Sequence, residues 1–139
     1  MSRQFATFTV AGARYGIDVL RVQEALRMQT RTAVPLAPAG ISGLVNLRGQ
    51  VVMLLDLRTR LRLGPLEGDA EPMMIVVEVD GEPISLLVDE IGDVIDAEDS
   101  QFEAPPDTLP AALREVILGA YKLDDGLLLA LDVTRATAA

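Results

Sequence analysis

The chain has 139 residues; half are apolar, 4 % are aromatic, and tryptophan, cysteine and histidine are absent. A single domain with an aliphatic core is expected, and the missing residue types exclude disulfides, thiolate chemistry, imidazole metal ligands and histidine-dependent nucleophiles. The net charge of −9 argues against nucleic acid as a partner, because its phosphates would be repelled.

The first elements predicted along the chain are two strands, over residues 5–10 and 14–17, joined by a turn. Asp18 is placed to cap a short helix that would carry Val22 on its apolar face. Residues 32–36 are expected to be extended, because prolines in this stretch disfavour helix.

The clearest hairpin in the sequence pairs residues 44–47 with residues 50–55. Arg48 and Gly49 occupy its turn, where glycine adopts a positive φ without a steric penalty. A helical turn is expected to follow over residues 56–61.

A loop rich in glycine, proline and acids, residues 64–72, is the most plausible boundary inside the chain. Short strands at hairpin intervals follow it, which is typical of an all-β barrel or a pair of barrels. These strands are predicted at 73–79, 83–88, 91–95, 116–123 and 127–131, with a short helical or frayed tail at 133–139.

Three aliphatic runs begin after a turn glycine and stop at an aspartate, namely Asp56, Asp89 and Asp132. The spacings differ, so the runs are not a strict repeat. Each aspartate is expected to end a strand, where its side chain can cap the backbone that follows.

Charge is unevenly distributed along the chain. Residues 1–63 hold nine arginines and three acids, a net charge of +6, whereas residues 64–139 hold three basic residues and eighteen acids, a net charge of −15. Two interpretations stay open: chance variation between two halves of a chain, or a basic and an acidic face that meet different partners.

Acidic clusters are the remaining candidates for chemistry. Asp89, Glu90 and Asp93, or Glu98 with Asp99, could hold Ca²⁺ or Mg²⁺. The calcium-loop pattern is absent, however, and adjacent residues of a strand point to opposite faces. A solvated acidic surface is the favoured interpretation, so no catalytic residue, metal site or cofactor is predicted.

The start of the sequence lacks the pattern of a signal peptide, and no apolar run approaches the roughly 20 residues that a membrane-spanning helix needs. A cytoplasmic protein that does not insert into the membrane is therefore expected.

Several segments, in order along the chain, carry a family resemblance. They are Tyr15-Gly16-Ile17-Asp18, the Gly-Leu-Val-Asn-Leu-Arg-Gly run over 43–49, Leu55-Asp56-Leu57-Arg58 and Leu87-Val88-Asp89-Glu90-Ile91. With them the sequence resembles the CheW-type coupling proteins of bacterial chemotaxis, over essentially the whole chain. The resemblance implies an all-β fold with a few short helices, in which two small five-stranded SH3-like barrels pack around a shared aliphatic core.

This resemblance also implies a single domain, residues 1–139. Residues 11–66 would form the first barrel, and residues 1–10 with 67–139 the second barrel and the tail. Ser85 departs from the family pattern, because glycine is common at this position, and it adds a side chain near the second barrel.

Proteins of this family have no enzymatic activity, so the resemblance implies a non-catalytic adaptor. Its expected partners are the cytoplasmic tip of a chemoreceptor, held in an apolar groove between the barrels, and the regulatory domain of a CheA-type histidine kinase, held at an exposed barrel end. Association with membrane-bound receptor arrays and self-association in rings are further expectations. Two alternatives stay open: a scaffold of the same fold in pilus motility or array localisation, and a sensor domain for a small ligand or a metal.

Partner contacts are expected at seven residues, with Arg48 first. An arginine at a hairpin tip has no role in the core, and its guanidinium can clamp a carboxylate or backbone carbonyls of a partner helix. The full set is Arg48, Asn46, Gly43, Gly49, Val22, Glu24 and Val45.

Several of these residues also have a purely structural interpretation. Local hydrogen bonding explains Asn46 better than a partner does, and core packing explains Val22 equally well. Asp56 and Arg58 are expected to be structural groups at a strand end, paired with each other or with Arg48.

Overall fold

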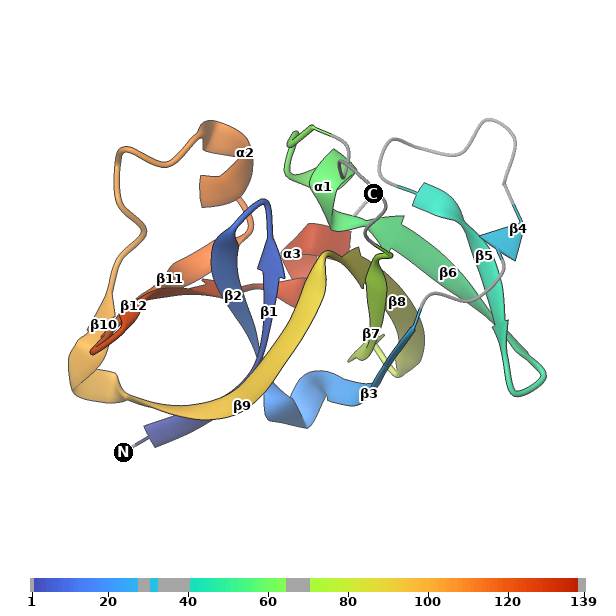
Figure 1. Cartoon of the computed structure of the whole chain (residues 1–139), viewed down its shortest axis with the longest axis horizontal. Helices are drawn as coiled ribbons and strands as arrows, with labels where there is room; N and C mark the ends of the chain where they lie inside the picture. The colour runs from blue at the N-terminus through green and yellow to red at the C-terminus, as the bar shows by residue number, and fades with distance from the viewer. Residues whose placement is uncertain (1, 28–30, 33–40, 65–70, 138–139) are drawn as a thin grey trace.

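The computed structural model describes residues 2–27, 31–32, 41–64 and 71–137, and most of these residues lie in β-strands. The strands form two sheets that lie at opposite ends of the long axis (Figure 1). The predicted all-β class with a few short helices is thereby confirmed. Among the described residues the longest helix has five residues, and no helix is long and apolar enough to cross a membrane.

The first sheet has the strand order β10-β11-β12-β2-β1-β9, with β12 and β2 parallel and the other neighbours antiparallel. Its edge strands β9 and β10 are joined by the short helix η2 (Asp99–Gln101), so the sheet curls back on itself as a small barrel. The strands are β1 (Ser2–Val10), β2 (Ala13–Asp18), β9 (Glu90–Glu98), β10 (Phe102–Glu103), β11 (Ile117–Leu123) and β12 (Gly126–Leu131).

The second sheet has the strand order β3-β7-β8-β6-β5-β4, with β6 and β8 parallel and the other neighbours antiparallel. Each sheet therefore has five full strands and one of two residues, β4 or β10. The strands are β3 (Val22–Arg27), β4 (Arg31–Thr32), β5 (Ile41–Leu47), β6 (Gln50–Asp56), β7 (Met73–Val79) and β8 (Glu82–Val88). The remaining helices are η1 (Val19–Arg21), α1 (Leu57–Arg60), α2 (Ala111–Arg114) and α3 (Val133–Thr137).

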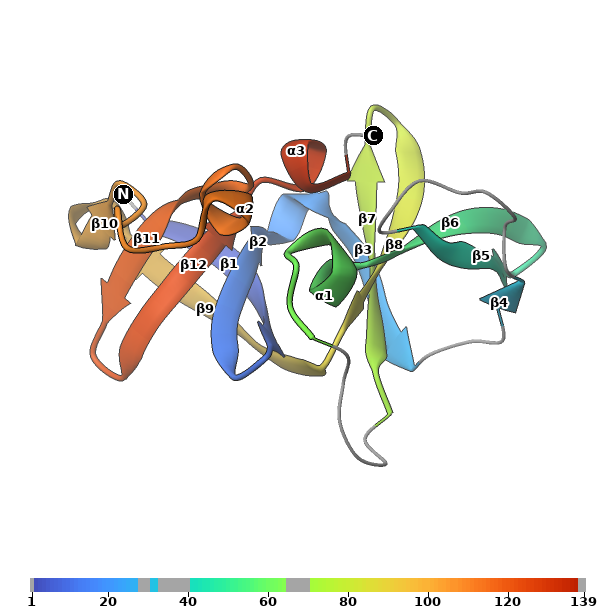
Figure 2. The ribbon, with the colours of Figure 1, turned by 90° about the horizontal axis from the view of Figure 1, so that it is seen from above.

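The two halves of the chain, β1 to β6 and β7 to β12, are structural repeats that exchange a two-stranded hairpin. The β1–β2 hairpin is followed by β3, which pairs with β7 in the second sheet. The β7–β8 hairpin is followed by β9, which pairs with β1 in the first sheet. The described chain therefore crosses between the sheets twice, through η1 and at Asp89 (Figure 2).

Backbone details support this repeat. The β1–β2 and β7–β8 turns have the same pair of positive φ angles, 52° and 81° in one and 53° and 82° in the other. The β5–β6 and β11–β12 ladders each shift register directly before an equivalent glycine, Gly43 or Gly119. Asp56 and Asp132 also correspond, because each lies at the end of the last strand of its half and accepts a backbone N–H of the next helix.

The sequence predicts hairpins in this fold better than it predicts strand partners. The predicted strand pair 44–47 and 50–55, the helical turn after Asp56 and the strands of the second half are confirmed. Most of the predicted extended segment 32–36 and of the loop 64–72 lies outside the described residues.

The predicted helix beginning at Asp18 is wrong beyond its first turn. Asp18 does accept the backbone N–H of Leu20, at 3.0 Å, but the helical residues end at Arg21. From Val22 to Arg27 the chain alternates between less and more exposed side chains and pairs with β7. Pairing with a distant strand overrides the local helical spacing here.

The expected barrel halves, 11–66 and 1–10 with 67–139, do not coincide with the two sheets. β2 belongs to the first sheet, because it pairs with β1 and β12, and β7 and β8 belong to the second. The largest buried cluster draws on both sheets, for example on Phe8 and Tyr15 from the first and Ile75 and Leu86 from the second. The two barrels therefore share one core, which is predominantly aliphatic.

Ser85 is fully buried on β8, and its hydroxyl has no hydrogen-bond partner among the described residues. Burying a hydroxyl without a hydrogen-bond partner costs free energy, because the hydroxyl loses its hydrogen bonds to water. Alanine has no hydroxyl and avoids this cost. We predict that Ser85→Ala raises the free energy of unfolding by about 1 kcal/mol in urea titrations. Thr7→Val should do the opposite, because the buried Thr7 hydroxyl donates to the Asp93 carbonyl at 2.5 Å. A destabilised Ser85→Ala variant would show that the serine hydroxyl is paired.

Candidate functional site

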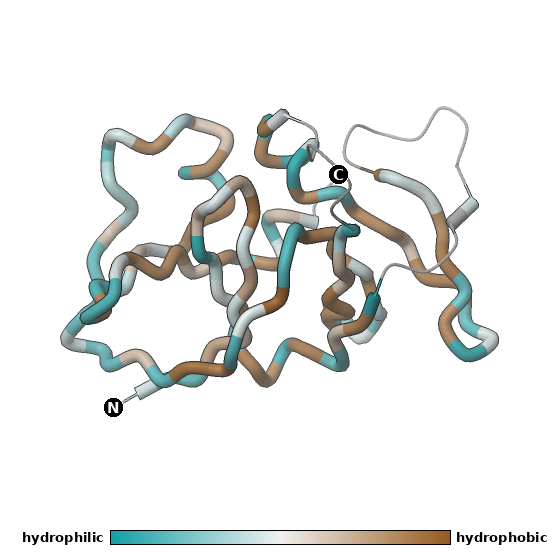
Figure 3. The backbone as a smooth tube through the Cα atoms, viewed as in Figure 1, coloured by the Kyte–Doolittle hydropathy of each residue, from teal (hydrophilic) through white to brown (hydrophobic). Residues whose placement is uncertain are grey.

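The tip of the β5–β6 hairpin carries Arg48 in an unusual backbone conformation. Leu47 pairs with Gln50, so Arg48 and Gly49 form a two-residue turn, and both have positive φ angles, 53° and 86°. Asn-Gly and Gly-Gly are the sequences that such a turn favours, because other side chains are strained there. Arginine at this position therefore does not serve the turn itself. Figure 3 shows this tip as hydrophilic at the end of largely hydrophobic strands.

Glu24 on β3 holds the Arg48 guanidinium in place. Two hydrogen bonds join them, Nη1 to Oε2 at 2.5 Å and Nη2 to Oε1 at 2.9 Å. The Arg48 side chain remains 80 % exposed, whereas that of Glu24 is 27 % exposed. Because β3 is an edge strand and β5 lies near the other edge of the same sheet, the pair also links the two sides of the second barrel. The structure thus brings together two of the residues expected to contact a partner.

The other expected contact residues are less available. Val45 is 1 % exposed in the interior of the second barrel, so its side chain cannot meet a partner directly. The Asn46 side chain accepts the backbone N–H of Gly49 at 2.9 Å, as its local interpretation requires. Gly43 is buried at the register shift of β5, with a φ of 150°. Val22 is half-buried against the shared core.

Arg58 pairs with Asp89 instead of with Asp56 or Arg48, which corrects the expected pairing. Nε donates to Oδ1 at 2.8 Å and Nη2 to Oδ2 at 2.6 Å, and the two side chains are only 17 % and 13 % exposed. Asp56 instead caps α1 by accepting the Arg58 backbone N–H. A second donor, the Ala11 backbone N–H, reaches the Asp89 carboxylate at 2.8 Å. These hydrogen bonds, led by Arg58, hold the pKa of Asp89 below its usual value.

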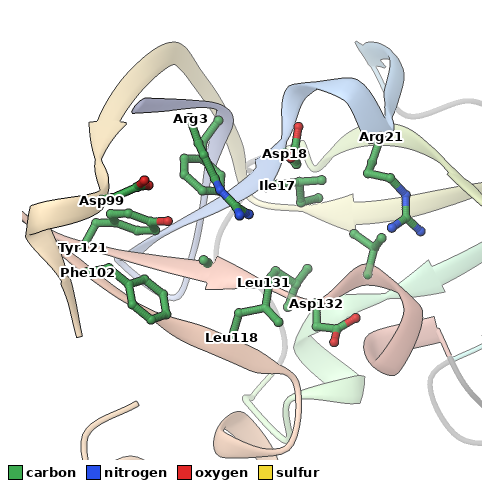
Figure 4. A pocket seen from close by; sticks show the side chains of 13 residues that line it. Arg3, Ile17, Asp18, Arg21, Asp99, Phe102, Leu118, Tyr121, Leu131 and Asp132 are labelled. Atoms are coloured by element: carbon green, nitrogen blue, oxygen red, sulfur yellow. The ribbon is translucent and has the colours of Figure 1, made fainter. Parts of the chain in front are cut away.

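A groove of about 610 Å³ opens at the end of the first barrel and was not anticipated from the sequence. Its apolar floor includes Phe5, Tyr121 and Phe102, whose ring centroids lie 5.2 and 5.1 Å apart in successive pairs. Figure 4 shows Phe102 and Tyr121 at one end of the groove and Arg21 and Asp132 at the other. Burial raises the pKa of Tyr121 above its usual value.

The internal repeat explains why this groove is open. In the second barrel the equivalent interior positions hold Leu54 and Leu87, both buried. The strand registers place Ala130 where Leu54 stands and Asp18 where Leu87 stands. A smaller and a polar side chain thus replace two leucines. The groove is therefore a departure from the repeat and not a requirement of the fold.

An exposed leucine lies next to this groove. Leu20 is 88 % exposed in η1, and Arg21 beside it lines both the groove and a smaller hollow that contains Leu20. Phe102 and Leu118, which line the groove, are also substantially exposed. Single exposed apolar residues are ordinary, but several around one groove are typical of an interaction surface. In the sequence, the only signal for this surface is Leu20, an apolar residue close to the charged Asp18 and Arg21.

Comparisons with known proteins agree with the fold. The family model described as CheW-like domain matches residues 4–138. The chemotaxis protein CheW of Treponema pallidum is 28 % identical over 136 residues, 95 % of this chain and 80 % of that protein. The chemotaxis protein CheW of Bacillus subtilis is 36 % identical over 100 residues, 72 % of this chain and 64 % of that protein.

A solved structure gives the same result. The crystal structure of the scaffolding protein TtCheW from Thermoanaerobacter tengcongensis matches with a TM-score of 0.83 and 28 % identity, over 94 % of this chain and 89 % of that one. The expectation of two SH3-like barrels is confirmed by this match.

The Asp89 carboxylate should make the free energy of unfolding depend on pH in the acidic range. Its pKa is lower in the folded than in the unfolded chain, so its stabilisation is fully present above the unfolded pKa of about 4 and is lost as the pH falls through the folded value. We predict that Asp89→Asn lowers the free energy of unfolding by about 2 to 3 kcal/mol at pH 7. The difference from the parent protein should shrink as the pH falls below about 4.

Denaturant titrations at a series of pH values measure this. Asp125→Asn is the matched control, because Asp125 forms a two-point pair with Arg14 but is largely exposed. Its loss should change stability little at any pH. Equal effects of the two substitutions would show that the Arg58–Asp89 pair is no more stabilising than a surface pair.

Proposed function

This chain belongs to the CheW-like domain family, and from this premise we propose that it is a non-catalytic adaptor coupling the cytoplasmic tip of a chemoreceptor to a CheA-type histidine kinase. The fold offers two separate candidate surfaces for the two partners. One lies around Arg48 and Glu24 on the second barrel, and the other is the groove end of the first barrel. We assign the receptor to the former and the kinase to the latter.

The observation that carries the receptor assignment is the Arg48 guanidinium. It is exposed at a hairpin tip, it is oriented by Glu24, and it occupies a backbone position that asparagine or glycine would fill with less strain. Strained backbone at an exposed polar residue is a feature of binding sites. The pair with Glu24 uses one N–H on each terminal nitrogen, and the remaining donors are available to a carboxylate or carbonyls on a receptor helix.

The kinase assignment is supported by the apolar surface at the other end of the molecule. The regulatory domain of a CheA-type kinase would share this fold, so two barrel ends could meet with their exposed apolar residues between them. Leu20 and the groove beside it supply such a surface on this chain. Apolar anchors that enter pockets supply most of the energy of protein–protein contacts.

Charge gives this end of the molecule a further property. With the described loops that connect their elements counted in each case, the first sheet and its helices α2, α3 and η2 carry five basic and twelve acidic groups, a net charge of −7. The second sheet with η1, α1 and the crossover carries seven of each and is neutral. Because of the strand exchange, the net charges of the two barrels differ from those of residues 1–63 and 64–139. A kinase surface with positive charge would be drawn to the first barrel and not to the second.

Arg48→Asn separates binding from folding. Asparagine suits the turn, and an exposed ion pair contributes little to stability, so the variant should unfold at a denaturant concentration close to that of the parent. We predict that its affinity for a receptor signalling fragment falls at least tenfold in isothermal titration calorimetry, with kinase binding retained. Arg14→Asn, which breaks the pair between β2 and Asp125 in the β11–β12 turn, should bind normally. Unchanged receptor affinity of Arg48→Asn would remove Arg48 from the interface.

Leu20→Ser tests the kinase surface. Since Leu20 is 88 % exposed, replacing it should leave the fold intact and reduce binding of the kinase regulatory domain about tenfold, as loss of an interface anchor does. Val51→Ser removes another exposed aliphatic side chain, on β6, and serves as the control. If both variants bind the kinase domain as the parent does, the groove end is not its docking surface.

A further inference from the structure

Polar contacts between the two barrels concentrate at the points where the chain crosses from one to the other. In the first crossover, Arg21 of η1 donates to the Glu78 carbonyl on β7 at 3.0 Å and to the Thr134 hydroxyl in α3 at 3.2 Å. In the second, Asp89 lies between β8 and β9 and binds Arg58. Away from the crossovers, Arg60 of α1 donates to the Ala136 and Arg135 carbonyls of α3, at 3.0 and 3.3 Å. The remaining contact between the barrels is largely apolar packing in the shared core.

The second crossover is the more tightly held. Hydrogen bonds from three segments far apart in sequence meet at Arg58 and Asp89. Arg58 makes two to the carboxylate and one to the Gly64 carbonyl, at 2.7 Å. The Ala11 N–H makes another to the carboxylate, and the Asp89 N–H donates to the Thr9 carbonyl at 3.0 Å. We call Arg58 and Asp89 the crossover clasp.

The clasp connects both barrels and not merely two loops. Arg58 lies in α1, directly after β6 of the second sheet, whereas Ala11 lies in the β1–β2 turn of the first sheet. Asp89 is the residue through which β8 of the second sheet continues into β9 of the first. Two other two-point ion pairs of the described residues stay within one sheet: Arg48 with Glu24, and Arg14 with Asp125.

Directional bonds and apolar packing constrain the barrels differently. Apolar burial keeps two surfaces together but is not directional, so it fixes the angle between them less strictly than hydrogen bonds do. Charged, bidentate and mostly buried hydrogen bonds are the strongest directional contacts available. The clasp has these properties, and it is placed where a small change in backbone direction turns β9 and the barrel to which it belongs.

We propose that the crossover clasp fixes the angle between the two barrels and thereby couples binding at one barrel to binding at the other. Arg58 and Asp89 are positioning residues, since neither lies at the Arg48 tip or in the groove. The coupling half of this inference rests on the proposed function, because it requires one partner on each barrel. The angular half does not.

A distance measurement without any partner tests the angular half. The chain has no cysteine, so Val51→Cys on β6 and Leu127→Cys on β12 can carry the two spin labels of a double electron–electron resonance experiment. Both positions are exposed and equivalent in the repeat, and their hairpins lie toward opposite ends of the molecule (Figures 1 and 2). The parent should give a narrow distance distribution.

Asp89→Asn and Arg58→Lys should each broaden or shift that distribution. Arg58→Lys keeps the positive charge but loses the two-point geometry, so it is the variant less disruptive to folding. Circular dichroism at the same temperature checks that both variants remain folded. Asp125→Asn, which breaks the pair within the first sheet, should leave the distribution as in the parent. A folded clasp variant with the parental mean and width would overturn the proposal.

A binding cycle tests the coupling half. The affinity of the kinase regulatory domain is measured with and without a saturating receptor signalling fragment, and allosteric coupling of about fivefold or more is expected in the parent. In the clasp variants the factor should fall below about twofold, with the affinity for each partner alone unchanged. Equal coupling in parent and variants, or no coupling in the parent, would overturn this half. If neither fragment binds the parent, the proposed function fails, and the distance measurement still decides the role of the clasp.

Discussion

In this protein the strand that follows the first hairpin of each half of the chain becomes an edge strand of the other barrel. Since β3 follows the β1–β2 hairpin but pairs with β7, and β9 follows the β7–β8 hairpin but pairs with β1, neither sheet can be completed alone. The shared core, the two crossovers and the clasp at Asp89 all follow from this exchange. It makes the protein one cooperative unit although its outline shows two barrels, and it gives two distant surfaces a common mechanical connection.

Local chemistry was enough to predict the hairpins of this fold. The Arg48–Gly49 turn, the aspartate caps at Asp18 and Asp56, and the alternation in the later strands each depend on a few neighbouring residues. Strand exchange depends on pairing between residues far apart in sequence, such as Val22 with Val77 and Phe5 with Ile95, which no local pattern records. For the same reason β3 was predicted as helix: Val22 and Leu26 have helical spacing, and only the partner strand β7 selects the extended form.

The candidate site shows the same division between local and distant information. Arg48 could be singled out because a hairpin tip gives arginine no core role, and Asn46 because its side chain can reach the adjacent turn. Glu24 as the partner of Arg48, and Asp89 as that of Arg58, could not be paired from the sequence. The first pair meets only because β3 joins the second sheet, and the second only because β6 and β8 pair in parallel. The groove was hidden for another reason. It exists because Ala130 is smaller, and Asp18 more polar, than the equivalent Leu54 and Leu87 of the second barrel. The two halves differ too much in sequence for this equivalence to be recognised without the structure.

The two-fold repeat has a consequence for the origin of the molecule. Two copies of a half-length chain, each lending a two-stranded hairpin to the other, would form an intertwined homodimer with identical tips, grooves and crossovers. Joining the copies into one polypeptide frees each half to change alone, and the differences between the halves are the traces of that freedom. One crossover has Arg58 where the other has Thr134, one tip has Arg48 where the other has acids, and one barrel interior is filled where the other is open. An assembly with two identical ends would in this way have become a single chain whose two ends differ.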